Sequence, residues 1–284
     1  MTKIHGHVQE ILHTDVLREV VLSGGCISDV RRLTLGDGRE IVAKVGAGAA
    51  PGLTLEGSML RFLNANTALP VPNILFADDH LLLMSFIPGG GSISVTTEED
   101  AAHHLATLHN ITAASFGFSY DTLIGGLPQP NPPESSWLTF FRDHRLMHMG
   151  EHAHAAGQLP AQILSRLEKL CAQLDRWLTE PASPSLLHGD LWSGNILVYA
   201  GRISGFVDPA IYYGDSEIEL AFTTLFGTFG ESFFRKYAEL RGLGPGFFEE
   251  RRDIYNLYPL LVHIRLFGGH YVDSLERTIK RFGF

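Results

Sequence analysis

Three polar residues near the middle of the chain have the types and spacing that phosphoryl transfer needs. Asp190 and Asn195 lie five positions apart in the stretch LLHGDLWSGNILV, and Asp208 follows Asp190 by eighteen positions. In this chemistry one aspartate accepts the proton of the attacking hydroxyl, while an amide and a second carboxylate hold Mg²⁺ against the nucleotide phosphates. The alternative is a tight polar turn between buried strands, which Gly189 and Ser193 favour on turn chemistry alone.

A lysine and a glutamate earlier in the chain supply the charges that such a site needs around the phosphates. Lys44 lies in the short apolar run IVAKV, and Glu56 follows in a segment with helical spacing. Ile-Val-Ala-Lys is close to the Val-Ala-Ile-Lys element, whose lysine contacts the α- and β-phosphates and pairs with a helix glutamate. Either residue alone is typical of a solvated surface charge. Their order along one chain with the His-Gly-Asp loop favours a phosphotransferase site over a plain turn.

The first third of the chain contains the elements that must position Lys44 and Glu56. Apolar positions over 8–22 have helical spacing and predict a first helix. Residues 23–45 predict a β-hairpin that turns at Gly-Asp-Gly, and residues 53–65 predict a helix. Residues 71–87 predict two strands joined at Asp78-Asp79.

The rest of the chain reads differently. PGGGS at 88–92 is typical of a linker, and the segments after it have mostly helical periodicity. Residues 115–135 are rich in proline and glycine and predict a long, functional loop. We therefore expect an α+β protein with a small β-rich domain over 1–88 and a larger, mainly helical domain over 89–284.

Composition limits the partners and the compartment. The 284 residues carry a formal net charge of -9 and no dense Lys/Arg run, which argues against nucleic-acid and anionic-membrane partners. The N-terminal residues MTKIHGHVQE lack the apolar core of a signal peptide, and no apolar run is long enough to cross a bilayer. With two cysteines there is no disulfide framework, so the cytoplasm is the expected location.

Several longer motifs resemble those of one family. The sequence is similar to the protein kinase-like superfamily and, over nearly its whole length, to the fructosamine kinase (ketosamine-3-kinase) family. The motifs that carry this resemblance are SGGCIS at 23–28, IGGLPQPNP at 124–132, HGDLWSGNIL at 188–197, DPAIYYGDSEIELA at 208–221 and LFGGHY at 266–271.

This resemblance implies a bilobal protein kinase-like fold and an enzyme that uses ATP and Mg²⁺. It implies phosphorylation of the third carbon's hydroxyl in a ketosamine, a fructosamine or ribulosamine adduct, whose phosphorylated form breaks down and frees the amine in deglycation repair. The adduct is a small molecule or is carried on a glycated protein. A phosphotransferase for an aminoglycoside or another small hydroxylated acceptor is the alternative, and a binding protein without activity is a third.

The resemblance also implies roles for single residues. Asp190 is the base, Asn195 and Asp208 bind the metal, and Lys44 with Glu56 clamps the phosphates. The remaining nucleotide contacts implied are the hinge residues Met84, Ser85 and Ile87 and the phosphate-loop residues Gly24, Gly25 and Ser28.

Three residues are implied at the substrate, each with a structural alternative. Trp192 offers a platform for the sugar chain or fills the core beside the loop. His263 lies near the acceptor or is a core histidine. Asp215, with Glu217 and Glu219, meets the cationic amine, or these acids enrich a helix N-terminus for structural reasons.

Two further features stay open from the sequence. Cys26 lies in the Gly-rich turn, where a thiol could be a redox switch or an inert loop residue. His148 and His152 have the i, i+4 spacing of a zinc pair, although surface histidine runs are common. Gly189 replaces the Arg that protein kinases use to hold a phosphorylated loop, so regulation by loop phosphorylation is not expected.

Overall fold

The computed structural model describes residues 3–22, 29–46 and 52–284, and the chain divides into two compact units. Unit 1 is formed by residues 1–92 and 194–209, and unit 2 by residues 93–193 and 210–284. The domains expected at 1–88 and 89–284 stay a prediction. The compact units differ from them chiefly by assigning residues 194–209 to unit 1.

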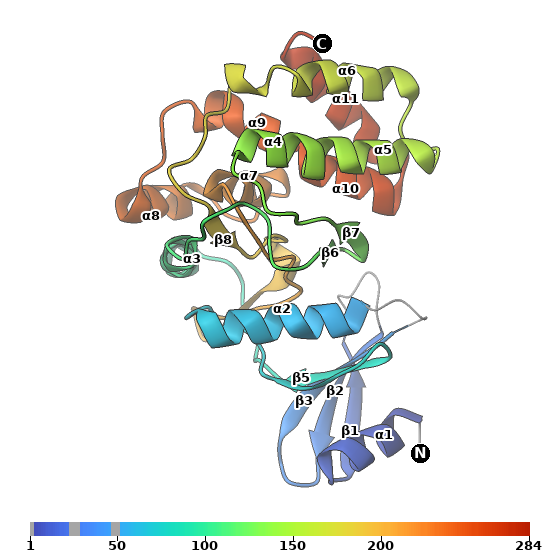
Figure 1. Ribbon diagram of the computed structural model, residues 1–284. Coiled ribbons are helices and arrows are strands. Elements are labelled where there is room, and N and C mark those ends of the chain that lie inside the picture. Colours follow the sequence, from blue (N-terminus) through green and yellow to red (C-terminus); the bar gives the residue numbers. More distant parts are fainter. Residues whose placement is uncertain (1–2, 23–28, 47–51) are drawn as a thin grey trace. The chain divides into compact units, whose positions relative to one another are not determined.

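Unit 1 is built on a five-stranded antiparallel sheet with the strand order β1-β2-β3-β5-β4 (Figure 1). Helix α2 lies along this sheet, and a two-stranded hairpin, β9–β10, completes the unit. The elements are α1 (Lys3–Leu12), β1 (Val16–Val21), β2 (Asp29–Leu35), β3 (Glu40–Val45), α2 (Gly52–Asn66), β4 (Ile74–Ala77), β5 (Leu81–Ser85), β9 (Ile196–Tyr199) and β10 (Arg202–Phe206).

The predicted first helix over 8–22 is wrong in its extent. Helix α1 ends at Leu12, and His13 takes a left-handed φ of 54° that stops the helix. Residues 16–21 then form strand β1, in which Val16 pairs with Leu35 of β2. The predicted β-hairpin, the helix at 53–65 and the strand pair at 71–87 are confirmed for the described residues as β2–β3, α2 and β4–β5.

Alternate side chains of the sheet form the core of unit 1. Leu33 and Leu35 of β2, Ile41 and Ala43 of β3 and Leu83 of β5 are all buried, as period-two alternation requires. Val8 of α1 is fully buried against this cluster. The amphipathic face of α1 therefore covers one face of the sheet.

Hairpin β9–β10 is held to the segment that follows β5. The Gly91 N–H donates to Val198 O over 2.8 Å, and the Ser204 hydroxyl donates to Pro88 O. A Cβ on Gly205 would lie 2.7 Å from Ile87 Cδ1, so a larger residue there would push the Ile87 side chain aside. These contacts explain why residues 194–209 group with the first 92 residues.

Unit 2 is mainly helical. Two short antiparallel ladders, β6–β7 and β8–β11, lie among its helices (Figure 1). Its regular elements are α3 (Val95–His109), β6 (Thr122–Ile124), β7 (Leu127–Gln129), α4 (Trp137–Phe141), the π-helical η1 (Arg142–Met147), α5 (His148–Ala155), α6 (Ala161–Cys171), η2 (Leu174–Arg176), β8 (Ser185–Leu187), β11 (Tyr212–Gly214), α7 (Ser216–Leu225), α8 (Glu231–Arg241), η4 (Phe247–Arg251), α9 (Arg252–Tyr255), α10 (Leu257–Phe267), η5 (Gly269–Tyr271) and α11 (Val272–Arg281). The short helical turn η3 (Ser193–Asn195) leads from unit 2 into unit 1.

The proline-rich segment 115–135 is more regular than a long loop. It contains the hairpin β6–β7, which turns at Gly125 and Gly126, both with positive φ. A two-residue turn with positive φ at both positions matches the twist of a hairpin, and glycine adopts it without strain.

None of the helices in the described part of the chain is long and apolar enough to cross a membrane.

Candidate active site

Lys44 is the centre of a charged cluster in unit 1. Its Nζ donates to Glu56 Oε1 over 2.6 Å and also bonds to Asp208 Oδ1. Lys44 extends from β3, Glu56 from α2, and Asp208 from the residues just after β10. The structure thus brings together three of the residues that the sequence predicted for the nucleotide site.

Burial and charge explain how this cluster is held. The Lys44 side chain is buried, and burial alone would lower the pKa of its ammonium group. The carboxylates of Glu56 and Asp208 outweigh burial and raise the pKa of Lys44, so the side chain is a permanent cation. Burial in turn raises the pKa of Glu56, against the attraction of Lys44.

The sequence around Glu56 explains how α2 comes so close to the sheet. A Cβ on the next residue, Gly57, would lie 2.7 Å from Ala77 Cβ of β4, a distance that real Cβ atoms do not show. Glycine at this position lets the helix pack directly on the strand. As a result, the Glu56 carboxylate reaches Lys44 of β3, the strand that lies on the other side of β5 from β4.

Asn195 and Asp208 lie at the same end of hairpin β9–β10. Ile196 pairs with Phe206, and the Val207 N–H donates to Asn195 O over 3.0 Å, so the ladder continues as far as these two residues. Asp208 has a left-handed φ of 54°, and its side chain is 40% exposed. An amide oxygen and a partly exposed carboxylate are oxygen ligands that suit Mg²⁺, so these residues fit the metal expected there.

The segment after β5 has the features expected of an adenine hinge. Met84 is buried in β5, where it pairs with Val42 and Ile74. The Ser85 N–H donates to Asn73 O, which holds the strand end in place. Among the residues that the structure describes, the Ile87 N–H has no hydrogen-bond acceptor, so this donor is available to a ligand. The adenine contacts themselves stay a prediction.

The predicted phosphate-loop residues cannot be placed. Gly24, Gly25 and Ser28 lie outside the described residues, and so does Cys26. Their roles therefore stay predictions from the sequence.

The loop that carries Asp190 lies in unit 2, follows strand β8 and depends on one glycine. Gly189 has a φ of 87°, and a Cβ there would lie 2.0 Å from Ala210 O. The Ala210 N–H donates to His188 O over 2.8 Å, which fixes this close approach. The glycine is therefore required by the local packing, and Asp190 follows it at the end of the loop.

A buried glutamate from α7 holds the loop backbone. Glu219 Oε1 accepts from the Gly189 N–H over 2.6 Å, and Oε2 accepts from the His188 N–H over 3.2 Å. His109 of α3 donates from Nε2 to Glu219 over 2.8 Å, and its Nδ1 forms a hydrogen bond of 2.7 Å with the Tyr237 hydroxyl. Burial alone would raise the pKa of Glu219, but the bonds from His109 and Gly189 keep that pKa below its ordinary value.

This finding corrects one expectation from the sequence. Glu219 is 3% exposed and its carboxylate is taken up by the loop backbone and His109, so it cannot meet a substrate amine. Glu217, two residues earlier, forms an ion pair with Arg251. Apart from the helical periodicity, nothing in the sequence distinguishes Glu219, whose side chain faces inward, from the other acidic residues of this run.

The motif IGGLPQPNP has a structural role that the sequence did not predict. Gln129 Nε2 donates to Ala210 O over 3.0 Å, and Gln129 Oε1 accepts from the Tyr258 hydroxyl over 2.8 Å. Asn131 accepts from the guanidinium of Arg145, which is fully buried over the ring of Tyr212. This buried polar network holds the backbone from Ala210 to Tyr212, where the chain enters unit 2 after Asp208.

The two aromatic substrate candidates differ in their surroundings. Trp192 is half-buried, so part of its ring remains accessible, and its contact with a sugar stays a prediction. His263 is half-buried among Phe226, Phe267 and Tyr271, with ring centroids 4.8 to 5.5 Å away.

The hydrogen bond of His263 determines which ring nitrogen can accept. Its Nδ1 lies 2.7 Å from Pro259 O. A carbonyl oxygen can only accept, so Nδ1 carries the hydrogen and the neutral ring leaves Nε2 as an acceptor. Burial lowers the pKa of His263 and keeps the ring neutral near pH 7. Its place at the acceptor stays a prediction.

Asp215 is the N-cap of α7, which is the structural alternative considered for it. Its Oδ1 accepts from the Glu217 N–H over 2.9 Å and its Oδ2 from the Tyr255 hydroxyl over 2.7 Å. In the β8–β11 ladder Gly214 pairs with Ser185, whereas Tyr212 pairs with Leu187. Asp215 therefore lies at the ladder end away from His188. Its contact with the reacting substrate stays a prediction, and its two oxygens bond to the first turn of α7 and to Tyr255 of α9.

The histidine pair shows no further metal ligands. The rings of His148 and His152 are 4.2 Å apart by their centroids. Within residues 3–22, 29–46 and 52–284, no group of three or more His, Cys, Asp or Glu side chains is arranged to hold a metal ion.

Comparison with known proteins identifies the family. The family model described as fructosamine kinase matches residues 1–282. The chain belongs to the fructosamine kinase family. A "probable ketoamine kinase" of Vibrio parahaemolyticus is 31% identical over 94% of this chain and 92% of its own length. The chloroplastic protein-ribulosamine 3-kinase of Arabidopsis thaliana is 30% identical over 95% of this chain and 83% of its own length.

Solved structures confirm the predicted α+β, protein kinase-like fold. A candidate fructosamine-3-kinase from Thermobifida fusca is similar with a TM-score of 0.88 and 30% identity, over 99% of this chain and 98% of that one. The aminoglycoside phosphotransferase APH(2")-IIa, solved with gentamicin, has a TM-score of 0.67 at 17% identity, over 99% of this chain and 96% of that one. At that identity the likeness concerns the fold alone.

Proposed function

We propose that this fructosamine kinase family member transfers the γ-phosphoryl group of ATP to the 3-hydroxyl of ketosamines, in a Mg²⁺-dependent reaction. The observation that carries the proposal is the cluster of Lys44, Glu56 and Asp208 in unit 1, with Asn195 beside Asp208 at the open end of one hairpin. The family match and the relatives named ketoamine kinase and ribulosamine 3-kinase support the acceptor class.

Different residues of unit 1 would contact the phosphates, the metal ion and the adenine of ATP. Lys44 supplies a permanent positive charge for the α- and β-phosphates, and Glu56 orients it. Asn195 and Asp208 would hold Mg²⁺, which supplies positive charge to the phosphate oxygens when bound. The Ile87 N–H is an available donor for the adenine edge.

Asp190 accepts the proton of the sugar hydroxyl as its oxygen attacks the γ-phosphorus. One oxygen–phosphorus bond forms, and the bond between the γ-phosphorus and the oxygen of the departing ADP breaks. Glu219 holds the His188 and Gly189 N–H groups and so fixes the loop that carries Asp190. The phosphorylated adduct then breaks down and releases the amine, so the reaction would serve deglycation of small molecules, with glycated protein as a further acceptor, in the cytoplasm.

A substrate panel tests the proposal. The purified protein is incubated with Mg²⁺ and ATP and with fructosyl-lysine, ribulosyl-lysine, an aminoglycoside and the free sugars. We expect ADP release with the two ketosamines only, and a phosphate on the third carbon's oxygen by ³¹P NMR. Transfer only to the aminoglycoside would contradict the acceptor class, and ATP binding without transfer to any acceptor would favour a binding protein.

A further inference from the structure

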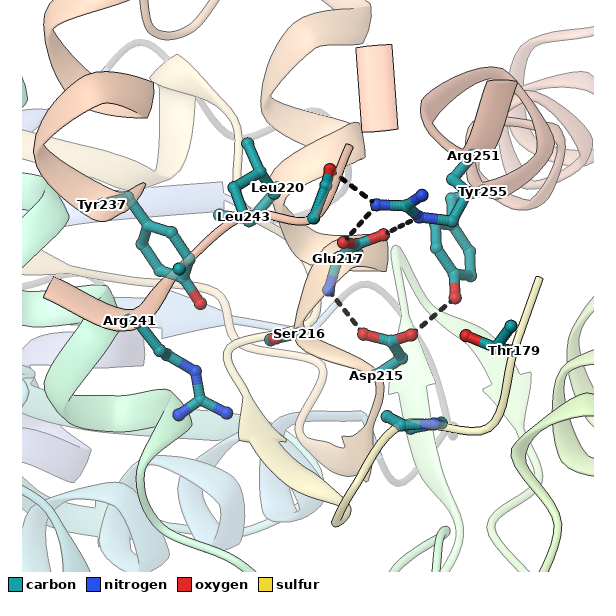
Figure 2. Close-up of a pocket in the computed structure, with 13 residues that line it drawn as sticks. Thr179, Asp215, Ser216, Glu217, Leu220, Tyr237, Arg241, Leu243, Arg251 and Tyr255 are labelled. Atoms are coloured by element: carbon teal, nitrogen blue, oxygen red, sulfur yellow. Dashed lines mark hydrogen bonds and ion pairs between the residues drawn. The ribbon is translucent and has the colours of Figure 1, made fainter. Parts of the chain in front are cut away.

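Unit 2 contains a cavity that the proposed reaction does not use. Its volume is about 540 Å³, and it lies where the N-terminus of α7, the C-terminal end of α8 and the residue at the junction of η4 and α9 meet. Figure 2 shows Tyr237 and Arg241 on one side of it and Asp215, Tyr255 and Arg251 on the other.

The cavity is separate from the catalytic loop. Arg241 donates to the hydroxyl of Ser185, the first residue of β8, and Asp215 follows Gly214, which pairs with Ser185. The loop that carries Asp190 begins after Leu187, at the other end of this ladder. Ser185 and Asp215 beside the cavity and the loop with Asp190 are therefore at opposite ends of the β8–β11 ladder.

Arg241 brings a positive charge without a carboxylate partner. Its guanidinium donates to Asn110 Oδ1 over 2.5 Å and to Ser185 Oγ over 2.8 Å, and both acceptors are neutral. In the described part of the chain, no carboxylate lies within ion-pair distance of Arg241. A guanidinium has five N–H donors, so donors remain for an anionic group in the cavity.

Asp215 brings the opposite charge, also without an ion-pair partner. Its two oxygens accept from the Glu217 N–H and the Tyr255 hydroxyl, and a carboxylate has further acceptor positions. Burial, together with the charge of Glu217, raises its pKa to about 6. The side chain is thus ionised at pH 7.5 but poorly compensated, because Arg251 is engaged by Glu217 and by two backbone carbonyls.

We propose that this cavity binds a small α-amino acid as a zwitterion, with its carboxylate on Arg241 and its ammonium group on Asp215. A ligand with only one charge would satisfy one wall and leave the other uncompensated, at a cost in desolvation. Leu220 and Leu243 also line the cavity and suit an apolar side chain. The proposal does not depend on the kinase reaction.

Calorimetric titration with three related molecules tests the ligand class. L-leucine is compared at pH 7.5 with 4-methylpentanoate, which lacks the amine, and with 3-methylbutylamine, which lacks the carboxylate. No ATP or ketosamine is present, so failure here is distinguishable from failure of the proposed reaction. We expect saturable binding of leucine and at least about tenfold weaker binding of each half molecule, since tenfold corresponds to about 1.4 kcal/mol. No saturation with leucine, or equal binding of either half molecule, overturns the proposal.

Matched variants test the place. Arg241→Met should abolish leucine binding, whereas Arg235→Met should leave it unchanged, because Arg235 lies on the same helix but pairs with Glu99 on the surface. Leucine binding that survives Arg241→Met contradicts the assignment. If Arg241→Met does not fold, a crystal of the natural protein soaked with leucine decides, by density for the ligand between Arg241 and Asp215 or at another place.

Discussion

The carboxylate of Glu219 accepts a hydrogen bond from the Gly189 N–H over 2.6 Å, one residue before the proposed base. The interaction joins α7 to the catalytic loop inside unit 2, and His109 completes it from α3. The position of Asp190 therefore depends on a buried residue that touches no substrate.

We expect Glu219→Gln to lower kcat by about 10- to 100-fold with little change in the KM for ATP, because the loop is misplaced while the nucleotide groups of unit 1 are intact. The amide of Gln places a donor where a carboxylate oxygen accepted, which leaves a buried group unsatisfied at a cost of about 1–3 kcal/mol. Steady-state kinetics and thermal melting measure both effects. Glu217→Gln, on the same helix, is the control. An equal loss of kcat in both variants would contradict the role of Glu219.

Gly189→Ala should prevent folding or destabilise the protein by more than about 4 kcal/mol, because the new Cβ would lie 2.0 Å from the backbone oxygen of Ala210, which is hydrogen-bonded to Gln129. Gly201→Ala is a matched control. Gly201 also has a positive φ, 75°, but no atom lies within 4 Å of its Cβ position. That change should cost only about 1–2 kcal/mol for the left-handed backbone. Urea unfolding compares the two, and similar losses would show that the close approach is not decisive.

Asp190→Ala should lower turnover by about three orders of magnitude or more while ATP still binds, because it removes the base and leaves Lys44 and the metal ligands in place. Single-turnover assays and calorimetry with ATP and Mg²⁺ measure the two properties. Asp273→Ala, an exposed change in the first turn of α11, should have no effect. A near-normal rate in Asp190→Ala would refute the assignment.

Gln129→Met should destabilise the protein by about 2–4 kcal/mol, because Ala210 O, Thr122 and the Tyr258 hydroxyl all lose a buried partner. The midpoint of urea unfolding measures the change. Gln158→Met is the control, since Gln158 accepts only a long, 3.3 Å bond from Arg265. If both variants unfold at the same urea concentration, the buried polar network around Gln129 does not stabilise the protein as described above.

The stability of the Asp215→Asn variant, measured relative to the natural protein, should increase as the pH rises. Burial raises the pKa of Asp215 from an ordinary 3.8 to about 6, so the folded state holds the proton more tightly than the unfolded chain. The natural protein therefore loses stability as the pH rises from about 4 to about 6, by about 3 kcal/mol at most. Urea unfolding at pH 4.5 and pH 7.5 measures the difference between the two proteins. A difference that does not depend on pH would show that the carboxyl group does not titrate in this window.

The sequence predicted the elements of unit 1 wherever local signals agreed with the sheet. Strands β2 and β3 alternate around a Gly-Asp-Gly turn, and Leu33 and Ile41 face each other in register. The first helix was misplaced because Val8, Val16 and Val20 fit one helical face by spacing. Pairing of Val16 with Leu35, a contact distant in sequence, overrides that period.

The site was predictable where the residue type carries the chemistry, as for Lys44, Glu56 and Asp208, which the structure brings together. The site was not predictable where the role of a residue depends on the direction in which its side chain points from the helix. Glu217 and Glu219 are both acids in one short run, yet Glu217 pairs with the partly buried Arg251 and Glu219 supports a backbone turn. Only the three-dimensional packing of α7 separates them.

Residues 194–209 belong to unit 1 although they follow the proposed base in sequence. A chimera made by joining one relative's first 92 residues to another's remainder would therefore combine Lys44 of one parent with Asp208 of the other. Exchanging unit 1 between relatives therefore requires two separate cassettes, residues 1–92 and residues 194–209, and the second is inserted between the two stretches that form the helical unit. Recombination at a single breakpoint disrupts the hairpin contacts at Gly91 and Val198 unless both parents match there.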